Sequence, residues 1–299
     1  MIEGHFSRAA LAAAYYNEDS LVFSIWRHIH GYTAALFFTT TGLIFVYLLT
    51  GTDVHMPYWQ NERVKKGFRR AGQLIFWGYL IQFEFIQIVY WLEDGGGYFH
   101  WFVAFHVLQS IGVGILALLT IYALYRQLPR IPLYALYALC AILLFACMSV
   151  IDNHTIADRK ALALSPGLQP DYWPRGFPEW IQNLVYGPFS EFSFFRFGGF
   201  VLLGGALGHL VRIFERSART VGFSLIFIAV GGGWVFLLMQ DLKTVVSVDP
   251  NLNLIGAGVV VGFIGIMMLI NSVFNIKAPL FMKLGQNTLP VYVLHVILL

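Results

Sequence analysis

Charged residues are scarce in this 299-residue chain, where they make up 12% of the sequence. A soluble domain carries about 25%, so too few charges remain here to coat a fold that is surrounded by water. This scarcity excludes an ordinary cytosolic enzyme, a nucleic-acid-binding protein and a disordered chain. Aliphatic and aromatic residues instead reach 58%, which indicates a protein whose main solvent is lipid.

Cysteine is also rare, with Cys140 and Cys147 as the whole complement. Seven residues apart on one helix, they would be separated by about 10 Å, which is too far for a disulfide. We expect both to be small core residues. The sequence also lacks a His-Glu-x-x-His motif and a cysteine pair at zinc-ligand spacing, so it predicts no metal site.

Long apolar runs dominate the chain, and eight of them approach the roughly 20 residues that a membrane span needs. They predict an all-α fold, a polytopic transmembrane helix bundle that forms a single domain over residues 1–299. The segment Met1–His5 resembles the outer end of a helix, so we expect a further N-terminal span before it. The eight expected spans are 31–50, 72–92, 101–125, 131–151, 194–213, 220–238, 254–275 and 284–299.

Lysine and arginine gather in alternate loops, which sets the expected orientation in the membrane. The basic loops lie at 51–71, 126–130, 214–219 and 276–283, and the positive-inside rule places them in the cytoplasm. The segment 152–193 then faces outward. Because it contains five prolines, we expect an irregular extracytoplasmic loop over the outer mouth of the bundle.

Several polar side chains fall inside the expected spans. Glu84 lies in the second span, and His106, Gln109 and Ser110 share a face of the third by their spacing of three and four. Ionisable groups at membrane depth are costly and face a bundle interior or a wet cavity. The two faces therefore indicate either a polar cavity that opens outward or a hydrogen-bonded pair that holds two helices together. Burying a carboxylate costs more than burying an amide, so Glu84 favours the cavity.

Histidines and carboxylates also collect at the expected outer rim, where Glu3 and His5 are joined by His28, His30 and Glu93. An imidazole beside a carboxylate is typical of general-base chemistry, and it is equally a common interfacial hydrogen-bonding set. The isolated His209 and His295 are instead expected to be core histidines. The glycines of the fifth and seventh expected spans predict close helix packing.

The densest run of charge lies in the first basic loop. It has two interpretations: a topological signal that contacts anionic lipid head groups, or a cytoplasmic dock for a nucleotide-like donor such as an acyl-coenzyme A. The residues of this run are Arg63, Lys65, Lys66, Arg69 and Arg70.

Several segments resemble a known family. Residues 1–5 are similar to the end of its first helix, and residues 178–183 and 186–190 are similar to the stretch that leads into its later spans. Residues 284–295, Leu-Gly-Gln-Asn-Thr-Leu-Pro-Val-Tyr-Val-Leu-His, are similar to a late block of bacterial multi-pass membrane acyltransferase-like proteins related to heparan-alpha-glucosaminide N-acetyltransferase. Residues 37–45, Phe-Phe-Thr-Thr-Thr-Gly-Leu-Ile-Phe, resemble the second helix of that family. Residues 198–205, Gly-Gly-Phe-Val-Leu-Leu-Gly-Gly, resemble one of its later helices.

The resemblance implies an acyl transfer across the membrane, from a cytoplasmic acyl-CoA donor such as acetyl-CoA to an extracytoplasmic glycan or lipid. His5 matches the histidine of the family and would serve as general base or acyl carrier. Glu3, or a carboxylate from another helix, would orient it. We place Glu84 and His106 in the same candidate catalytic set. The implied location is the bacterial cytoplasmic (inner) membrane.

Two other functions stay open at the level of sequence. An acyltransferase-like bundle can serve as a non-catalytic subunit of a larger membrane complex, with its aromatic surface against partner chains, pigments or lipids. A transporter is the third possibility, and the absence of paired broken helices or inverted repeats speaks against it.

Overall fold

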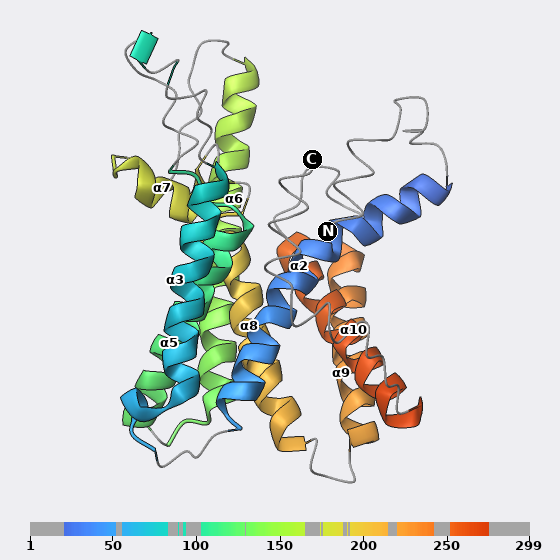
Figure 1. Cartoon of the computed structure of the whole chain (residues 1–299). Coiled ribbons are helices and arrows are strands. Elements are labelled where there is room, and N and C mark those ends of the chain that lie inside the picture. The colour runs from blue at the N-terminus through green and yellow to red at the C-terminus, as the bar shows by residue number, and fades with distance from the viewer. Residues whose placement is uncertain are drawn as a thin grey trace.

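The computed structural model describes residues 21–51, 56–82, 89, 92–93, 103–128, 130–164, 174, 176–187, 190, 192–214, 220–241 and 252–274. These residues form long helices that run side by side (Figure 1). The predicted fold class, an all-α polytopic bundle, is confirmed. The elements are α2 (Leu21–Leu49), the short 3-10 helix η2 (Tyr58–Gln60), α3 (Glu62–Gln82), α5 (Val107–Gln127), α6 (Leu133–Leu164), α7 (Glu179–Tyr186), α8 (Phe194–Phe214), α9 (Thr220–Asp241) and α10 (Leu252–Phe274).

Six of the described helices are long and apolar enough to cross a membrane, and each coincides with an expected span. The agreement follows from composition, because about 20 apolar residues match the thickness of the hydrocarbon layer. The chain is an integral membrane protein on this evidence. The third expected span is shifted, since its helix begins at Val107 and not at Trp101. The second expected span, 72–92, is not among the six: its first part is the end of α3, and most of 83–92 lies outside the described residues. The expected span 284–299 falls outside the described residues.

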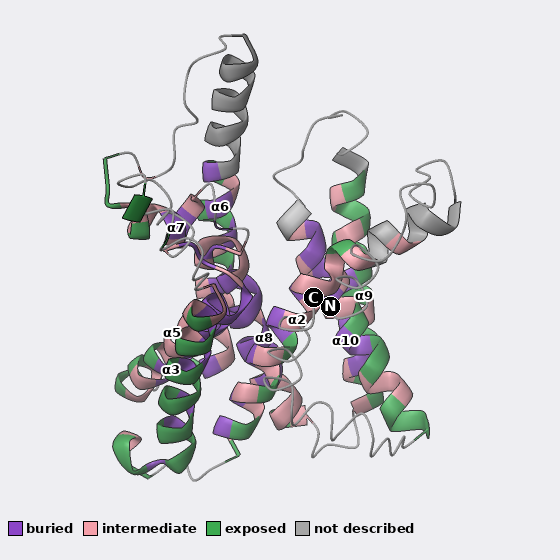
Figure 2. Cartoon of the chain, turned by 45° about the horizontal axis from the view of Figure 1, so that its top comes forward, coloured by how far each residue is buried: buried purple, intermediate pink, exposed green. Residues whose placement is uncertain are grey.

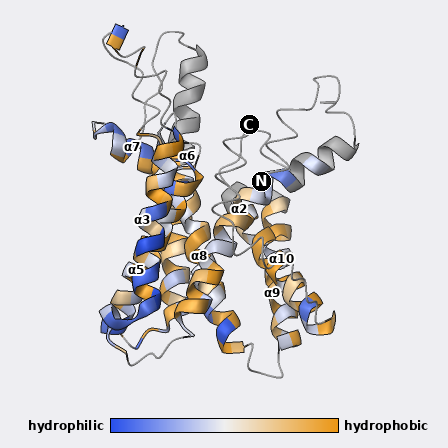
Figure 3. Ribbon diagram, in the orientation of Figure 1, coloured by the Kyte–Doolittle hydropathy of each residue, from blue (hydrophilic) through white to orange (hydrophobic). Residues whose placement is uncertain are grey.

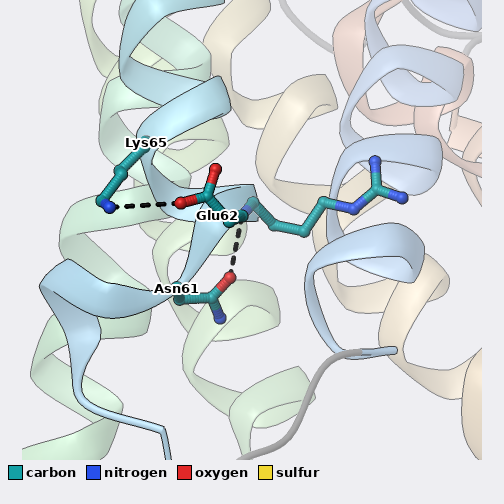
Figure 4. Close-up of polar contacts among 4 residues, drawn as sticks. Asn61, Glu62 and Lys65 are labelled. Atoms are coloured by element: carbon teal, nitrogen blue, oxygen red, sulfur yellow. Dashed lines mark hydrogen bonds and ion pairs between the residues drawn. The ribbon is translucent and has the colours of Figure 1, made fainter.

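The loop expected at 51–71 is wrong in its second half, because α3 already begins at Glu62. The buried Asn61 accepts a hydrogen bond from the backbone N–H of Arg63 at 2.8 Å (Figure 4). An asparagine in this position satisfies one of the free N–H groups at a helix start, and the carboxylate of Glu62 favours the positive end of the helix dipole. The basic run therefore lies on a helix.

The irregular loop expected over 152–193 is also wrong in part. Helix α6 continues through this range as far as Leu164. The eight residues of α7 form a second helical piece, which packs against α8. Between them lie residues of which only 174 and 176–178 are described.

Helix α8 is the hub of the core and packs against α2, α5 and α6. Its glycines explain how close these helices come. A Cβ atom on Gly204 would collide with the carbonyl oxygen of Thr39, and one on Gly208 with that of Leu43. The predicted close packing at these glycines is confirmed, since small residues let helix backbones approach in a membrane. Buried residues concentrate where these helices meet (Figure 2).

Helices α9 and α10 form a pair that has few contacts with the rest of the bundle. Gly231 of α9 meets the backbone of Gly258 and Gly262 of α10, and Gly265 meets the backbone of Ser224. The pair touches the bundle near Gly256, which lies against the ring of Phe200. The remaining surface of both helices is largely exposed and apolar.

The long helices alternate in direction along the chain, so the ends that flank the basic loops lie together at the lower end of the bundle in Figure 1. We call this the inner end and the opposite one the outer end, after the predicted orientation.

The expectation that both cysteines are core residues is wrong for Cys147, whose side chain is exposed on α6.

Candidate functional site

Three residues of the predicted catalytic set, Glu3, His5 and Glu84, lie outside the described residues. The fourth, His106, is half-buried at the outer end of the bundle. It is the N-cap residue of α5 and has an extended backbone, with φ −112° and ψ −174°. The predicted helical face shared by His106, Gln109 and Ser110 is therefore wrong in its first member, because His106 precedes the helix.

Gln109 lies on the first turn of α5 and is fully buried. Its Nε2 donates a hydrogen bond to Oε1 of Gln82 at the end of α3. Gln82 in turn donates from Nε2 to the carbonyl oxygen of Ala104 at 3.3 Å. That last bond fixes the orientation of both amides, because a carbonyl can only accept. Oε1 of Gln109 is then left without a partner among the described residues.

The same peptide unit continues the network on its other side. The N–H of Phe105 donates to Oγ of Ser190 at 2.8 Å. Ser190 donates to Oδ1 of Asn183 on α7 at 3.1 Å. Nδ2 of Asn183 is buried and has no partner within the described part of the chain. A directed chain of hydrogen bonds thus runs from Gln109 through the backbone to Asn183, and Ser110 adds a bond to the carbonyl oxygen of Phe192.

This outer polar network holds the backbone just before His106 between three helices. Of the two interpretations of Gln109 and Ser110, the hydrogen bond from Gln109 to Gln82 fits a polar contact that holds α5 and α3 together. Such networks are rigid when fully bonded, and an unpaired buried end is costly. Oε1 of Gln109 can accept a further hydrogen bond, and Nδ2 of Asn183 can donate one. A further polar group would be stabilised at either atom.

The basic residues form the second candidate region. Arg63, Lys65, Lys66, Arg69 and Arg70 are all exposed on α3. Lys65 pairs with Glu62 at 3.2 Å (Figure 4), and both side chains are more than half exposed, so the pair contributes little to stability. Within the described residues, the other four cations have no ion-pair partner.

The contacts between α3 and α5 show how deep these cations lie. Gly67 faces Leu119, Ala71 and Ile75 face Gly112, and Gly78 faces Gln109. The two helices are antiparallel, so this register places Arg69 and Arg70 beside residues 116–117, the middle of the α5 span. At 1.5 Å per residue this is about 16 Å from the inner end of α5, close to half of the roughly 30 Å hydrocarbon layer. In Figure 3 the lower half of α3 is hydrophilic beside hydrophobic helices.

Aromatic residues pack near the inner end, around the start of α3. Tyr58 donates to the carbonyl oxygen of Leu119 at 3.1 Å. Burial and the neighbouring Tyr122 raise the pKa of Tyr58 above its ordinary value. Arg212 donates to the hydroxyl of Tyr47 at 3.2 Å. His209, expected to be a satisfied core histidine, stacks on Tyr134, yet its buried Nδ1 has no partner among the described residues.

Three residues of the outer polar network, Gln82, Asn183 and Ser190, were not among the predicted site residues. Gln82 was within reach, because it lies on an expected span two residues before Glu84. Asn183 and Ser190 lie in segments that resemble the family, but nothing in the sequence indicated their bonds, since Phe105, the partner of Ser190, is 85 positions away along the chain. No three His, Cys, Asp or Glu side chains of the described ranges form a group that would hold a metal ion.

Residues 1–225 match the family model described as heparan-alpha-glucosaminide N-acetyltransferase, catalytic. The match covers three quarters of the 299-residue chain and includes the outer polar network, the basic face of α3 and the α2–α8 crossing. No curated protein and no solved structure shows a significant match to the chain.

Proposed function

Because the chain belongs to the heparan-alpha-glucosaminide N-acetyltransferase catalytic family, we propose that it is a membrane acyltransferase that uses a cytoplasmic acyl-CoA-type donor such as acetyl-CoA. The acceptor is a hydroxyl or amine of an extracytoplasmic glycan or lipid, and the membrane is a bacterial cytoplasmic membrane. The observation that carries the proposal is the family match over residues 1–225, on a chain with six span-length helices.

The proposed chemistry needs one general base. His5 removes the proton of the acceptor as its oxygen or nitrogen bonds to the acyl carbon. The carbon–sulfur bond of the thioester breaks, and the leaving thiolate takes up a proton. Glu3 orients the imidazole. Glu84 and His106 complete the set, with His106 held at the start of α5 by the outer polar network.

The donor is assigned to the inner end of α3. Of the five cations expected to bind it, Arg63, Lys65 and Lys66 lie nearest the inner end, where the phosphates of a water-soluble donor arrive. We assign the donor to Arg63 and Lys66. Both are exposed and lack an ion-pair partner among the described residues. Lys65 is paired with Glu62, and Arg69 and Arg70 lie one to two turns deeper.

A second candidate function is a non-catalytic subunit of a larger membrane assembly. The observation that favours it is the pair Arg69 and Arg70, exposed at the level of the middle of α5. Cations at this depth face a bundle interior or a wet cavity and not lipid.

The test is an acyl-transfer assay with the purified chain in nanodiscs, with acetyl-CoA as the donor and thiol release as the signal. We expect release to fall by about 10²–10⁴-fold in His5→Ala, the usual cost of losing a general base. His209→Phe on α8 is the matched control and should keep the wild-type rate. Arg63→Ala combined with Lys66→Ala should raise KM for acetyl-CoA and leave kcat unchanged. Wild-type release from His5→Ala would overturn the assignment, and no release from the wild type would favour the subunit.

A further inference from the structure

The exposed face of α3 differs from the exposed face of α6 at the same depth. Tyr137 fixes the level of α6, because its hydroxyl donates to the carbonyl oxygen of Leu118 at 3.0 Å. At the level of Arg69 and Arg70, α6 exposes the apolar side chains of Leu139 and Ile142. The face of α3 therefore presents two guanidinium groups where α6 presents hydrocarbon side chains.

Exposed aromatic residues lie on both sides of the two arginines along α3 and η2. Trp59 stacks on Phe68 with ring centroids 5.6 Å apart, and Phe76 packs edge-on against Trp77 at 5.9 Å. Trp59 is 68% exposed and Phe76 is 62% exposed. Arginine and large aromatic residues are the types that are enriched at the centres of protein interfaces and carry most of their binding energy.

Charge selects the kind of partner that covers this face. A second copy of the chain in a symmetric pair would bring the same cations against each other, and like charges repel. Lipid tails offer no acceptor for a guanidinium. A carboxylate does, because arginine and carboxylate groups form paired, charge-assisted hydrogen bonds, and polar groups in membrane spans pair with one another across helices.

We propose that the face of α3 formed by Arg69, Arg70, Phe76 and Trp77 binds a membrane-spanning helix of another subunit, which presents carboxylates level with the two arginines. Phe76 and Trp77 lie about one to two turns nearer the outer end and contact the apolar part of that helix. The interface is separate from the donor region, since Arg63 and Lys66 lie nearer the inner end of the same helix. The surface thus carries both the charge that attracts the partner helix and the aromatic groups that pack against it.

The experiment uses the full chain in lipid vesicles and a synthetic transmembrane probe, a leucine-alanine peptide of about 21 residues with two Asp residues four apart at its centre. Binding is followed by energy transfer between labelled chain and peptide. We expect the Asp peptide to bind about tenfold more tightly than its Asn counterpart, because charge-assisted hydrogen bonds are roughly twice as strong as neutral ones. Arg69→Glu with Arg70→Glu should lose this preference and select a Lys peptide instead. Arg63→Glu with Lys66→Glu is the matched control and should keep the Asp preference.

Equal binding of the Asp and Asn peptides would overturn the proposal, and so would an Asp preference that survives the reversal at Arg69 and Arg70. If the reversed chain does not fold, Arg69→Gln with Arg70→Gln should remove the preference without reversing it. A further measurement tests whether the chain itself, or a second copy of it, covers Arg70. A fluorophore at Arg70→Cys, in nanodiscs that hold one chain, should be reached by lipid-borne or water-borne quenchers. Protection in the single chain, or protection only in a dimer of this chain, would contradict a separate subunit.

Discussion

Helices α3 and α6 both contact α5, yet their exposed faces are opposite in character. Arg70 of α3 and Leu139 of α6 are both exposed and both lie close to the level of Leu118 on α5. One face presents cations and the other hydrocarbon, at a depth where a lipid-facing cation costs about 2.5–3.5 kcal/mol by insertion scales. Depth in the membrane therefore does not by itself decide what a helix face meets, and the charge of α3 indicates that protein or water covers it.

The largest effect is expected when a cation like those of α3 is placed on the exposed face of α6. Leu139 is 54% exposed, and Leu139→Arg places a guanidinium among the exposed apolar side chains of α6. We expect the free energy of unfolding in a bilayer to fall by about 2.5–3.5 kcal/mol, as measured by steric trapping. The reciprocal change, Arg70→Leu, should cost nothing in the purified chain. A neutral Leu139→Arg would show that the face of α6 is not in contact with lipid.

A smaller effect is expected from separating α3 from α5. A Cβ on Gly112 would lie 2.6 Å from Cγ1 of Ile75 and 3.0 Å from the carbonyl oxygen of Ala71. Gly112→Val should therefore cost about 1–3 kcal/mol, the usual range for overpacking, in a thermal unfolding measurement in detergent. Gly72→Ala on the exposed side of α3 meets nothing within 4 Å and is the control. Equal stability of the two variants would contradict the register on which the depth of Arg70 rests.

The smallest effect concerns the attachment of η2, which leads into α3. Tyr58→Phe removes the hydrogen bond to Leu119 and should cost about 0.5–1.5 kcal/mol. Because burial raises the pKa of Tyr58 above 10 in the folded protein, its contribution is complete below pH 10 and is lost as the pH rises through the folded-state value. The difference in melting temperature between wild type and variant should be constant from pH 7 to 9 and vanish at higher pH. A difference that grows with pH would show that the hydroxyl is not a donor.

The fold could be predicted from the sequence because it depends on the length and apolarity of the helical segments. Six of the expected spans are described as membrane-length helices, since runs such as 107–127 match the membrane thickness. The start of α3 was missed because the charges of Arg63 to Arg70 suggested a loop, although Asn61 and Glu62 together are a helix-start signal. The outer polar network could not be predicted from the sequence, because its bonds join Gln82, Ala104 and Asn183 through the tertiary fold. The catalytic assignment of His5 stays a prediction.

The depth of Arg70 in the membrane can be measured directly against that of Leu139. Nitroxide labels at Arg70→Cys and Leu139→Cys, in a chain with Cys140→Ser and Cys147→Ser, are compared by their relaxation with oxygen and with a water-soluble nickel chelate. We expect the backbones at the two positions to lie within about one helical turn, or 5.4 Å, of the same depth, near the middle of the membrane. An Arg70 label at the level of the lipid head groups, with the Leu139 label at the centre, would contradict this expectation.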